Sequence, residues 1–268
     1  MIRALAFDSW GDPAAMVALL LHGVGGGRAV WGDLVSGTGR AVAAAGWRAV
    51  AVDLPGYGDS PAIDPCDMAG LAASVVATLD ALAVDSALLV GHSMGGMVAQ
   101  EVVARSPQRV GALVLSGTSP AFGKAGGAWQ QQFLRDRLAP LDAGGGLAAL
   151  APALAQGMAS PSAPAEAIAR CVAVMSRVPE ATYRAALHAI VGFDRRADLA
   201  RITVPTLCLA GADDRNAPPA VMQAMAERIA GAEYECLPGV GHLANMEAPA
   251  AFHRALLSFL ERRCARRA

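Results

Sequence analysis

The residues best suited to chemistry gather around one serine. Ser93 lies in the run VGHSMGG, which has the pattern Gly-x-Ser-x-Gly. The apolar residues 86–90 precede it, and a stretch that favours helix, 95–105, follows it. A strand that turns sharply into a helix at such a motif leaves the serine hydroxyl exposed at the turn. Glycine and serine also occur in ordinary strand-to-helix turns, so the motif alone is suggestive. In this context it predicts Ser93 as a nucleophile.

A base and an acid for this serine lie further along the chain. A serine hydroxyl needs a base to remove its proton, and the base needs an acid to hold its tautomer. Of five histidines, His242 follows the last apolar run, 234–237, on a loop with glycines. Asp213 and Asp214 follow the apolar run 206–210. We expect His242 as the base and one of these aspartates as the acid, although a loop histidine alone is usually just solvent-exposed.

A glycine-rich turn also follows an earlier apolar run, in LLLHGVGGG from Leu19 to Gly27. Glycines let the backbone approach a ligand, so a free N–H here and that of Met94 could bind a developing oxyanion. The glycines could instead form a phosphate-binding loop. However, no Gly-x-Gly-x-x-Gly or Gly-Lys-Ser/Thr pattern follows, and the single lysine, Lys124, lies elsewhere. The sequence therefore favours an oxyanion site.

Short apolar runs alternate with segments of helical character along most of the chain. The runs are continuous, which is typical of strands buried on both faces of a parallel sheet. Their alternation with helices predicts βαβ units. The expected strands are 16–21, 48–52, 86–90, 112–116, 206–210 and 234–237, and the expected helices between them are 68–82, 95–105, 220–229 and 248–263.

The alternation stops between residues 119 and 202, where no strand is expected. Turn signals at 144–146 and 160–164 separate four helical segments. We therefore predict a core domain of residues 1–118 and 203–268 with a helical cap, 119–202, inserted between two of its strands. The expected cap helices are 128–138, 147–159, 165–177 and 183–190.

The cap is expected to close an apolar substrate pocket. Trp129 and Phe133 are the predicted substrate-binding residues, and Met175 would join them. These side chains could instead only pack the cap helices together. An arginine presents a planar fork that suits a carboxylate, so the cap arginines could meet a substrate carboxylate. The arginines considered are Arg135, Arg177 and Arg184.

Composition excludes several other classes of protein. Hydrophobic residues make up 54% of the chain and charged residues 17%, which excludes a disordered protein. The net charge of −1 argues against a nucleic-acid partner. The N-terminus lacks the apolar core of a signal peptide, and the longest apolar run, 14–21, is far below the ~20 residues that span a bilayer. We expect a cytoplasmic protein without a membrane partner.

The five cysteines are Cys66, Cys171, Cys208, Cys236 and Cys264. They are scattered along the chain without a Cys-x-x-Cys pair, so neither a disulfide framework nor a zinc site is expected. The sequence predicts no metal and no organic cofactor.

Taken together, the motifs resemble those of the α/β-hydrolase fold superfamily over nearly the whole chain. The matching stretches are LLLHGVGGG, VDLPGYGDS, GHSMGG, GADDRNAPP and GVGHLANMEAPAAF. The resemblance implies a mostly parallel sheet flanked by helices, with a helical cap. It implies a triad in the order Ser93, Asp214, His242, because Asp214 fits the family pattern Gly-x-x-Asp-x-x-x-Pro. It assigns the oxyanion hole to Val24 and Met94, with Gly25 as the fallback for Val24.

Within the superfamily the chain looks most like 3-oxoadipate enol-lactonases, although many of these lack the pair His22-Gly23 that is intact here. This predicts hydrolysis of a small carboxylic ester or (enol-)lactone through an acyl-enzyme. Carbon–carbon bond hydrolases of ring-fission diketones are the alternative, but they tend to have Asn and Trp where this chain has His92 and Leu243. Haloalkane dehalogenases use an aspartate nucleophile. A non-catalytic receptor on the same scaffold stays open, as does a homo-oligomer.

Overall fold

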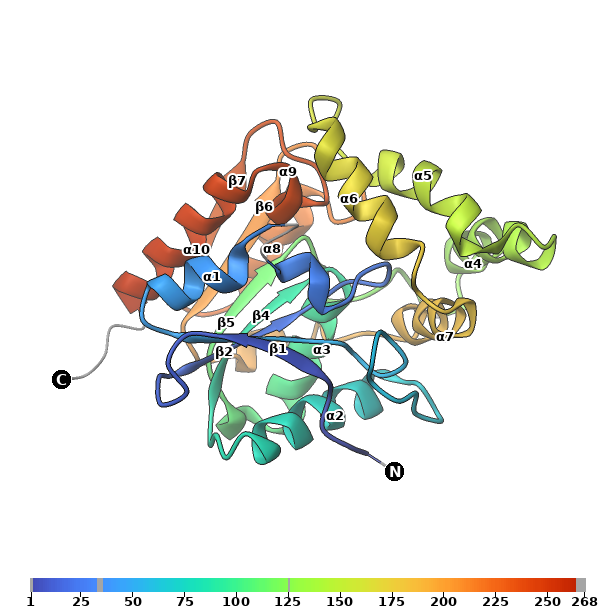
Figure 1. The fold of residues 1–268 in the computed structure, drawn as a ribbon. Helices are drawn as coiled ribbons and strands as arrows, with labels where there is room; N and C mark the ends of the chain where they lie inside the picture. The colour runs from blue at the N-terminus through green and yellow to red at the C-terminus, as the bar shows by residue number, and fades with distance from the viewer. Residues whose placement is uncertain (1, 33–35, 125, 264–268) are drawn as a thin grey trace.

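The computed structural model describes residues 2–32, 36–124 and 126–263. In this part of the chain a central sheet has seven strands in the order β1-β3-β2-β4-β5-β6-β7, with helices on both faces (Figure 1). All neighbouring strands are parallel except β1, which runs antiparallel to β3. The strands are β1 (Phe7–Trp10), β2 (Val17–Leu21), β3 (Arg48–Val52), β4 (Ala87–His92), β5 (Val110–Ser116), β6 (Thr206–Gly211) and β7 (Glu233–Leu237).

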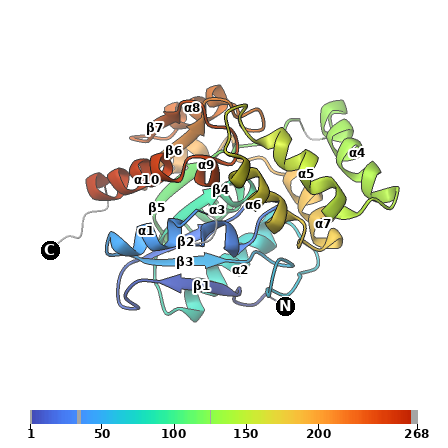
Figure 2. The ribbon, with the colours of Figure 1, turned by 45° about the horizontal axis from the view of Figure 1, so that its top comes forward.

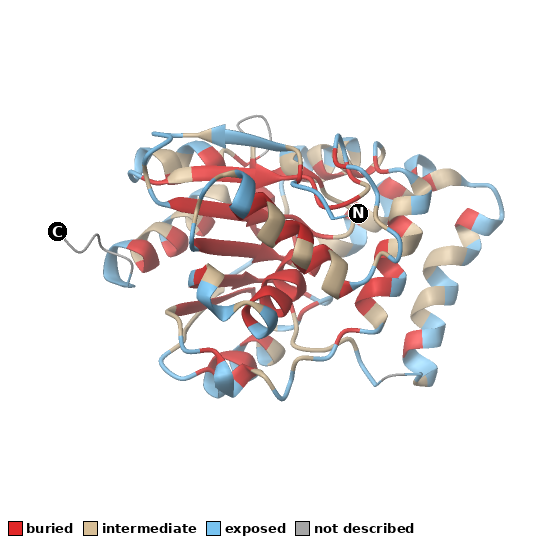
Figure 3. Cartoon of the chain, turned by 90° about the horizontal axis from the view of Figure 1, so that it is seen from below, coloured by how far each residue is buried: buried red, intermediate tan, exposed pale blue. Residues whose placement is uncertain are grey.

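The central strands are buried because their apolar residues face a core on each side. Successive side chains of a strand point to opposite faces. In β2, Leu19 and Leu21 belong to one core and Leu20 to the other. Figure 3 shows the sheet as a largely buried layer between helices that are exposed on their outer sides. Each fully buried leucine stabilises the fold by roughly 1.5–3 kcal/mol, so the continuous apolar runs place these strands at the centre.

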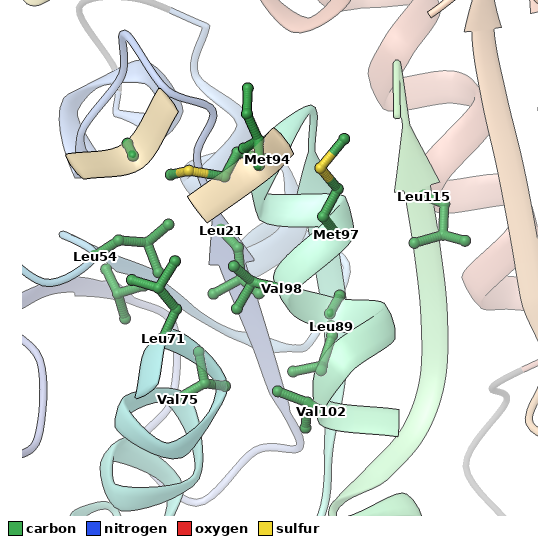
Figure 4. Close-up of a cluster of buried hydrophobic side chains, with 14 of the residues drawn as sticks. Leu21, Leu54, Leu71, Val75, Leu89, Met94, Met97, Val98, Val102 and Leu115 are labelled. Atoms are coloured by element: carbon green, nitrogen blue, oxygen red, sulfur yellow. The ribbon is translucent and has the colours of Figure 1, made fainter. Parts of the chain in front are cut away.

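Helices α2 (Met68–Ala81), α3 (Met94–Arg105) and α8 (Pro219–Arg228) cover one face of the sheet. Figure 4 shows this core, where Val98 and Val102 of α3 lie between Leu71 and Val75 of α2 and Leu89 of β4. Helices α1 (Thr38–Ala44) and α10 (Pro249–Arg263) cover the other face. A short helix, α9 (Ala244–Glu247), precedes α10. The described residues also include the 3-10 helices η1 (Arg28–Trp31), η2 (Pro107–Arg109) and η3 (Leu199–Arg201).

Four helices lie between β5 and β6 in the chain and gather at one end of the sheet (Figure 2). They are α4 (Ala128–Asp142), α5 (Gly146–Met158), α6 (Ala165–Met175) and α7 (Glu180–Val191). We call residues 119–202 the cap. Side chains of the cap line cavities that also contact Ser93, so the cap covers the edge at which the parallel strands end.

The predicted fold class is confirmed, and the structure adds elements that the patterns did not indicate. The edge strand β1 has the sequence FDSW and is mostly exposed, so it lacks the apolar run used to find strands. Its place comes from pairing with β3, in which Phe7 lies opposite Val52. Helix α1 has only seven residues. Helix α4 continues through Pro140 to Asp142, past the expected end at residue 138.

Candidate active site

The turn between β4 and α3 holds Ser93 in a strained backbone conformation, with φ 54° and ψ −120°. Positive φ is uncommon for residues other than glycine and is costly to maintain. The flanking glycines make the turn possible. A Cβ on Gly91 would lie 2.4 Å from the carbonyl oxygen of Gly95, and one on Gly95 would lie 2.2 Å from that of Leu21. The Gly-x-Ser-x-Gly spacing is therefore a steric requirement of this turn.

Three side chains from separate loops form a continuous hydrogen-bonded line. His242 Nε2 lies 3.0 Å from Ser93 Oγ, and His242 Nδ1 lies 2.8 Å from Asp214 Oδ2. The loops follow β4, β6 and β7, whose carboxyl ends meet at the same edge of the parallel sheet. The side chains of His242 and Asp214 are almost completely buried. The arrangement can pass a proton from the serine hydroxyl to the imidazole while the carboxylate holds the other ring nitrogen.

The acid of this line is Asp214 and not its neighbour Asp213, which is exposed. The second oxygen of Asp214, Oδ1, accepts the N–H groups of Asn216 at 2.8 Å and Ala217 at 3.0 Å. Burial works to raise the pKa of Asp214, but the charge and hydrogen bond of His242 and these two N–H groups outweigh it and lower the pKa below 3.8. Asp214 is therefore ionised at neutral pH.

The backbone N–H groups of Val24 and Met94 belong to residues near the nucleophile, because Val24 lines both cavities that Ser93 lines and Met94 follows Ser93 at the start of α3. In the described part of the chain neither donates to another protein acceptor. His22 orients the first of them. Its Nδ1–H donates to the carbonyl oxygen of Gly23 at 2.8 Å, and its Nε2 accepts the N–H of Leu54 at 3.0 Å. Because the Gly23 carbonyl and the Val24 N–H share one rigid peptide plane, fixing the oxygen fixes the direction of the N–H.

The next peptide of the same loop is also held in place. The hydroxyl of Tyr57 donates to the carbonyl oxygen of Val24 at 2.7 Å, which orients the N–H of Gly25, the fallback donor. The rings of Tyr57 and His22 pack edge to face with centroids 4.6 Å apart. The sequence reasoning missed Tyr57 and the orienting role of His22. Their position in the motifs VDLPGYGDS and LLLHGVGGG was the available signal.

A second histidine, His92, lies against the ring of His242, with centroids 4.9 Å apart. It is 6% exposed, and burial lowers its pKa to about 3. Its Nδ1 has no hydrogen-bond partner among the described residues. A neutral ring at this place fills space beside His242 without adding a positive charge that would oppose protonation of that imidazole.

Ser93 lies beside two cavities that share part of their walls. The smaller cavity, of about 80 Å³, reaches Asn245 and is mostly apolar. The larger cavity, of about 210 Å³, is lined by both predicted substrate-binding residues, Trp129 and Phe133. The shared wall includes Val24, Gly25, Ser93, Met158, Met175 and His242. A substrate that reaches Ser93 therefore contacts both the core and the cap.

Comparison with known proteins identifies the family of the chain. A family model described as the alpha/beta hydrolase fold matches residues 18–249. The chain belongs to the alpha/beta hydrolase fold family. The chain is 34% identical over 264 residues to a putative carbamate hydrolase, RutD, of Variovorax paradoxus strain S110, with 96% of each chain covered.

Two further relatives indicate the range of substrates in the family. A pimeloyl-[acyl-carrier protein] methyl ester esterase of Neisseria meningitidis strain H44/76 is 31% identical, with 88% of this chain and 90% of the relative covered. The crystal structure of the enol-lactonase from Burkholderia xenovorans LB400 has a TM-score of 0.82 and 25% identity, with 96% of each chain covered. The expected resemblance to enol-lactonases is confirmed. The relatives are named for hydrolysis of esters, carbamates or lactones.

The arginines of this hydrolase that reach the larger cavity are Arg137 and Arg215. The guanidinium of Arg137 lies over the ring of Phe133, 5.4 Å from its centroid. Among the described residues, neither arginine has a carboxylate oxygen within 4.0 Å. No aspartate or glutamate lines this cavity in the described chain, so its charged wall is entirely cationic.

The arginines expected from the sequence are placed differently. Arg135 is exposed and bonds Gln132. Arg184 pairs with Asp142 and Glu180. Arg177 lines a separate cavity beside Arg28 and Asp53. For Arg135 and Arg137 the helical phase of α4 decides the outcome, because residues two positions apart on a helix face different directions.

The described part of the chain also bears on metal binding, thiol chemistry and membrane crossing. No group of three or more His, Cys, Asp or Glu side chains there could hold a metal ion. Four of the cysteines are free thiols, and Cys264 lies outside the described residues. No described helix is both long and apolar enough to cross a lipid bilayer.

Proposed function

We propose that this hydrolase cleaves a small carboxylic ester or (enol-)lactone through an acyl-enzyme on Ser93. The observation that supports this most strongly is the hydrogen-bonded line from Ser93 Oγ through His242 to Asp214, with separations of 3.0 and 2.8 Å. It lies beside a cavity large enough for a small organic substrate.

In the first half of the reaction Ser93 Oγ attacks the substrate carbonyl while His242 Nε2 takes the hydroxyl proton. Asp214 keeps the proton on Nδ1 and stabilises the imidazolium. The carbonyl oxygen becomes an oxyanion and accepts the N–H groups of Val24 and Met94. When the tetrahedral intermediate collapses, the bond to the leaving oxygen breaks and His242 donates its proton to that oxygen. For a lactone the leaving oxygen stays attached to the acyl group.

In the second half water replaces the leaving group. His242 removes a proton from water, and the resulting hydroxide attacks the acyl carbon on Ser93. The bond from the acyl carbon to Oγ then breaks, and Oγ takes the proton back from His242. The net change is the addition of one water across the ester bond. Ser93, His242, Asp214 and the N–H groups of Val24 and Met94 act in both halves of the reaction. No atom changes its oxidation state, so the reaction needs no redox partner.

The cavity walls support a substrate with an apolar body and an anionic end. Trp129 and Phe133 offer aromatic surface, and Arg137 and Arg215 are guanidinium groups that have no carboxylate partner among the described residues. A substrate carboxylate placed against them would form charge-assisted hydrogen bonds. The smaller cavity would accept a compact apolar group on the other side of the scissile bond.

The test compares Ser93→Ala with Ser86→Ala, an exposed serine at the opposite end of β4. With p-nitrophenyl butyrate as substrate, Ser93→Ala is expected to lower kcat by a factor on the order of 10⁴, and Ser86→Ala is expected to leave it unchanged. A fluorophosphonate probe should label the parent and not Ser93→Ala. Near-parental turnover by Ser93→Ala would refute the serine mechanism.

A substrate panel separates the alternatives. The parent is assayed on p-nitrophenyl esters, enol-lactones and ring-fission diketones. Turnover of esters or lactones is expected. Turnover of the diketones alone would replace the proposal with carbon–carbon bond hydrolysis. A folded parent that neither reacts with the probe nor turns over any substrate would identify a binding protein.

A further inference from the structure

One buried carboxylate is not part of the hydrogen-bonded line of Ser93, His242 and Asp214 but lies beside the loop of residues 241–243, which we call the histidine loop. Glu247, the last residue of α9, is only 7% exposed. Among the described residues no Lys or Arg lies within 4.0 Å of its carboxylate. Removing a carboxylate from water is costly unless strong donors replace the water. The residues that supply such donors show what this side chain holds in place.

The donors are three backbone N–H groups, two of which bracket His242. Glu247 Oε2 accepts the N–H of Gly241 at 2.9 Å, and Oε1 accepts the N–H of Leu243 at 3.0 Å. The N–H of His242 itself donates to the carbonyl oxygen of Met158 at 2.8 Å. All three consecutive N–H groups of residues 241–243 therefore donate to acceptors within the protein. This fixes the peptide planes on both sides of the histidine and so the direction of its Cα–Cβ bond.

The third donor to Glu247 comes from the cap. The N–H of Ser160, in the connection between α5 and α6, donates to Oε2 at 3.0 Å. The two chain segments lie so close that a Cβ on Gly241 would be 2.4 Å from the Ser160 nitrogen. Met158, whose carbonyl holds His242, also lines both cavities beside Ser93. One carboxylate thus joins the histidine loop to a part of the cap that a bound substrate would contact.

We propose that Glu247 is a positioning residue that sets the orientation of the His242 imidazole and ties it to cap residues 158–160. The inference rests on the proposed function for its effect on catalysis. Glu247 does not touch the substrate. Its carboxylate holds the loop so that His242 Nε2 reaches Ser93 Oγ while Nδ1 stays on Asp214. Losing it releases the loop on both sides of the histidine and frees the cap connection at the same time.

The test uses Glu247→Gln and Glu247→Ala. The glutamine amide can place its oxygen where Oε2 accepts the N–H groups of Gly241 and Ser160. It then presents an NH₂ group to the N–H of Leu243, so one of the three hydrogen bonds is lost. Alanine loses all three. Because small misplacement of a catalytic group is costly, kcat is expected to fall about tenfold for Gln and about 100-fold for Ala, while KM changes less than about threefold.

A matched control is Glu101→Gln. Glu101 is also buried, at 3% exposure, and accepts bonds from Arg105 and Arg195, but it lines neither cavity beside Ser93. This variant is expected to lower the melting temperature with kcat unchanged. A fall in kcat as large in Glu101→Gln as in Glu247→Gln would show only general loosening of the fold and would overturn the proposal.

A second measurement needs no substrate. The proton on His242 Nδ1 gives a low-field NMR resonance that can be assigned by its loss in His242→Gln. Loosening of the loop should broaden or shift it in Glu247→Gln and leave it unchanged in Glu101→Gln. Parental kcat and an unchanged resonance in a folded Glu247→Gln would refute the positioning role. If the parent hydrolyses no substrate, the proposed function fails, and the resonance alone still decides the role of Glu247.

Discussion

Ser93 Oγ lies 3.0 Å from His242 Nε2, although 149 positions separate the two residues in the chain. The contact exists because β4 and β7 are parallel strands of one sheet and both end at the edge under the cap. Asp214 enters from the loop after β6, between them in both chain order and sheet order.

Replacing Asp214 by asparagine should impair proton transfer between Ser93 and His242 without changing the conformation of the loop that follows β6. In Asp214→Asn the amide oxygen can still accept the N–H groups of Asn216 and Ala217, but an NH₂ group then faces His242 and favours the wrong tautomer. We expect kcat to fall by a factor on the order of 10⁴. The exposed neighbour provides the control, since Asp213→Asn should keep kcat within about twofold because it does not touch the imidazole. Steady-state kinetics on p-nitrophenyl butyrate measures both, and equal losses would contradict the assignment of Asp214.

The cationic wall of the larger cavity should select anionic substrates. Arg137→Gln and Arg215→Gln are each expected to raise KM about tenfold for a p-nitrophenyl ester with a terminal carboxylate, the value of one lost charge-assisted bond. The neutral ester of the same length should be unaffected. Arg135→Gln, two positions away on α4 and outside the cavity, is the control. If Arg137→Gln raises KM equally for both esters, the proposal that the substrate has an anionic end is wrong.

Acid should destabilise the fold before the carboxylates titrate. Burial is the main cause that lowers the pKa of His22 to about 4 and that of His92 to about 3, from an ordinary value of 6.5. Between pH 6.5 and 4 the unfolded chain binds protons that the folded chain does not. The stability is therefore fully present above pH 6.5 and is lost as the pH falls. From pH 7.5 to 5.5 each histidine should lower the free energy of unfolding by about 1.4 kcal/mol.

Urea unfolding at the two pH values measures this loss. His92→Asn should reduce the drop by about 1.4 kcal/mol, because this histidine then no longer contributes to it. His188→Gln, a change at an exposed histidine, should leave the drop as it is in the parent. A parent whose free energy of unfolding is the same at pH 7.5 and 5.5 would contradict burial of neutral histidines.

Two glycine-to-alanine changes should have opposite effects on stability. A Cβ on Gly95 would meet the Leu21 carbonyl at 2.2 Å, so Gly95→Ala must move backbone and should lower the free energy of unfolding by at least about 3 kcal/mol. Gly157 is helical, and nothing lies within 4 Å of an added Cβ. Gly157→Ala should raise the free energy of unfolding by about 0.4–1 kcal/mol because the unfolded chain loses freedom. Chemical denaturation checks both, and a stable Gly95→Ala would contradict the tight turn.

The sequence by itself determined which residues meet at the edge of the sheet. Ser93, Asp214 and His242 each follow an apolar run that is continuous enough to be a buried strand, and the structure places all three strands where these runs predict. Such patterns act over a few residues, through the steric limits of a turn and the burial of consecutive side chains. The edge strand β1 lacked this signal because it is exposed and depends on its partner β3.

Only the tertiary structure decided which cap side chains face the nucleophile and what supports the histidine. Trp129 and Phe133 line the larger cavity, and the arginines that line it are Arg137 and Arg215 instead of the three considered from the sequence. Glu247 lies in the stretch GVGHLANMEAPAAF, but nothing in that stretch shows that its carboxylate also accepts the N–H of Ser160, 87 positions away in the chain. Which way a helix face or a carboxylate points is settled by long-range packing, and no short stretch of sequence contains that information.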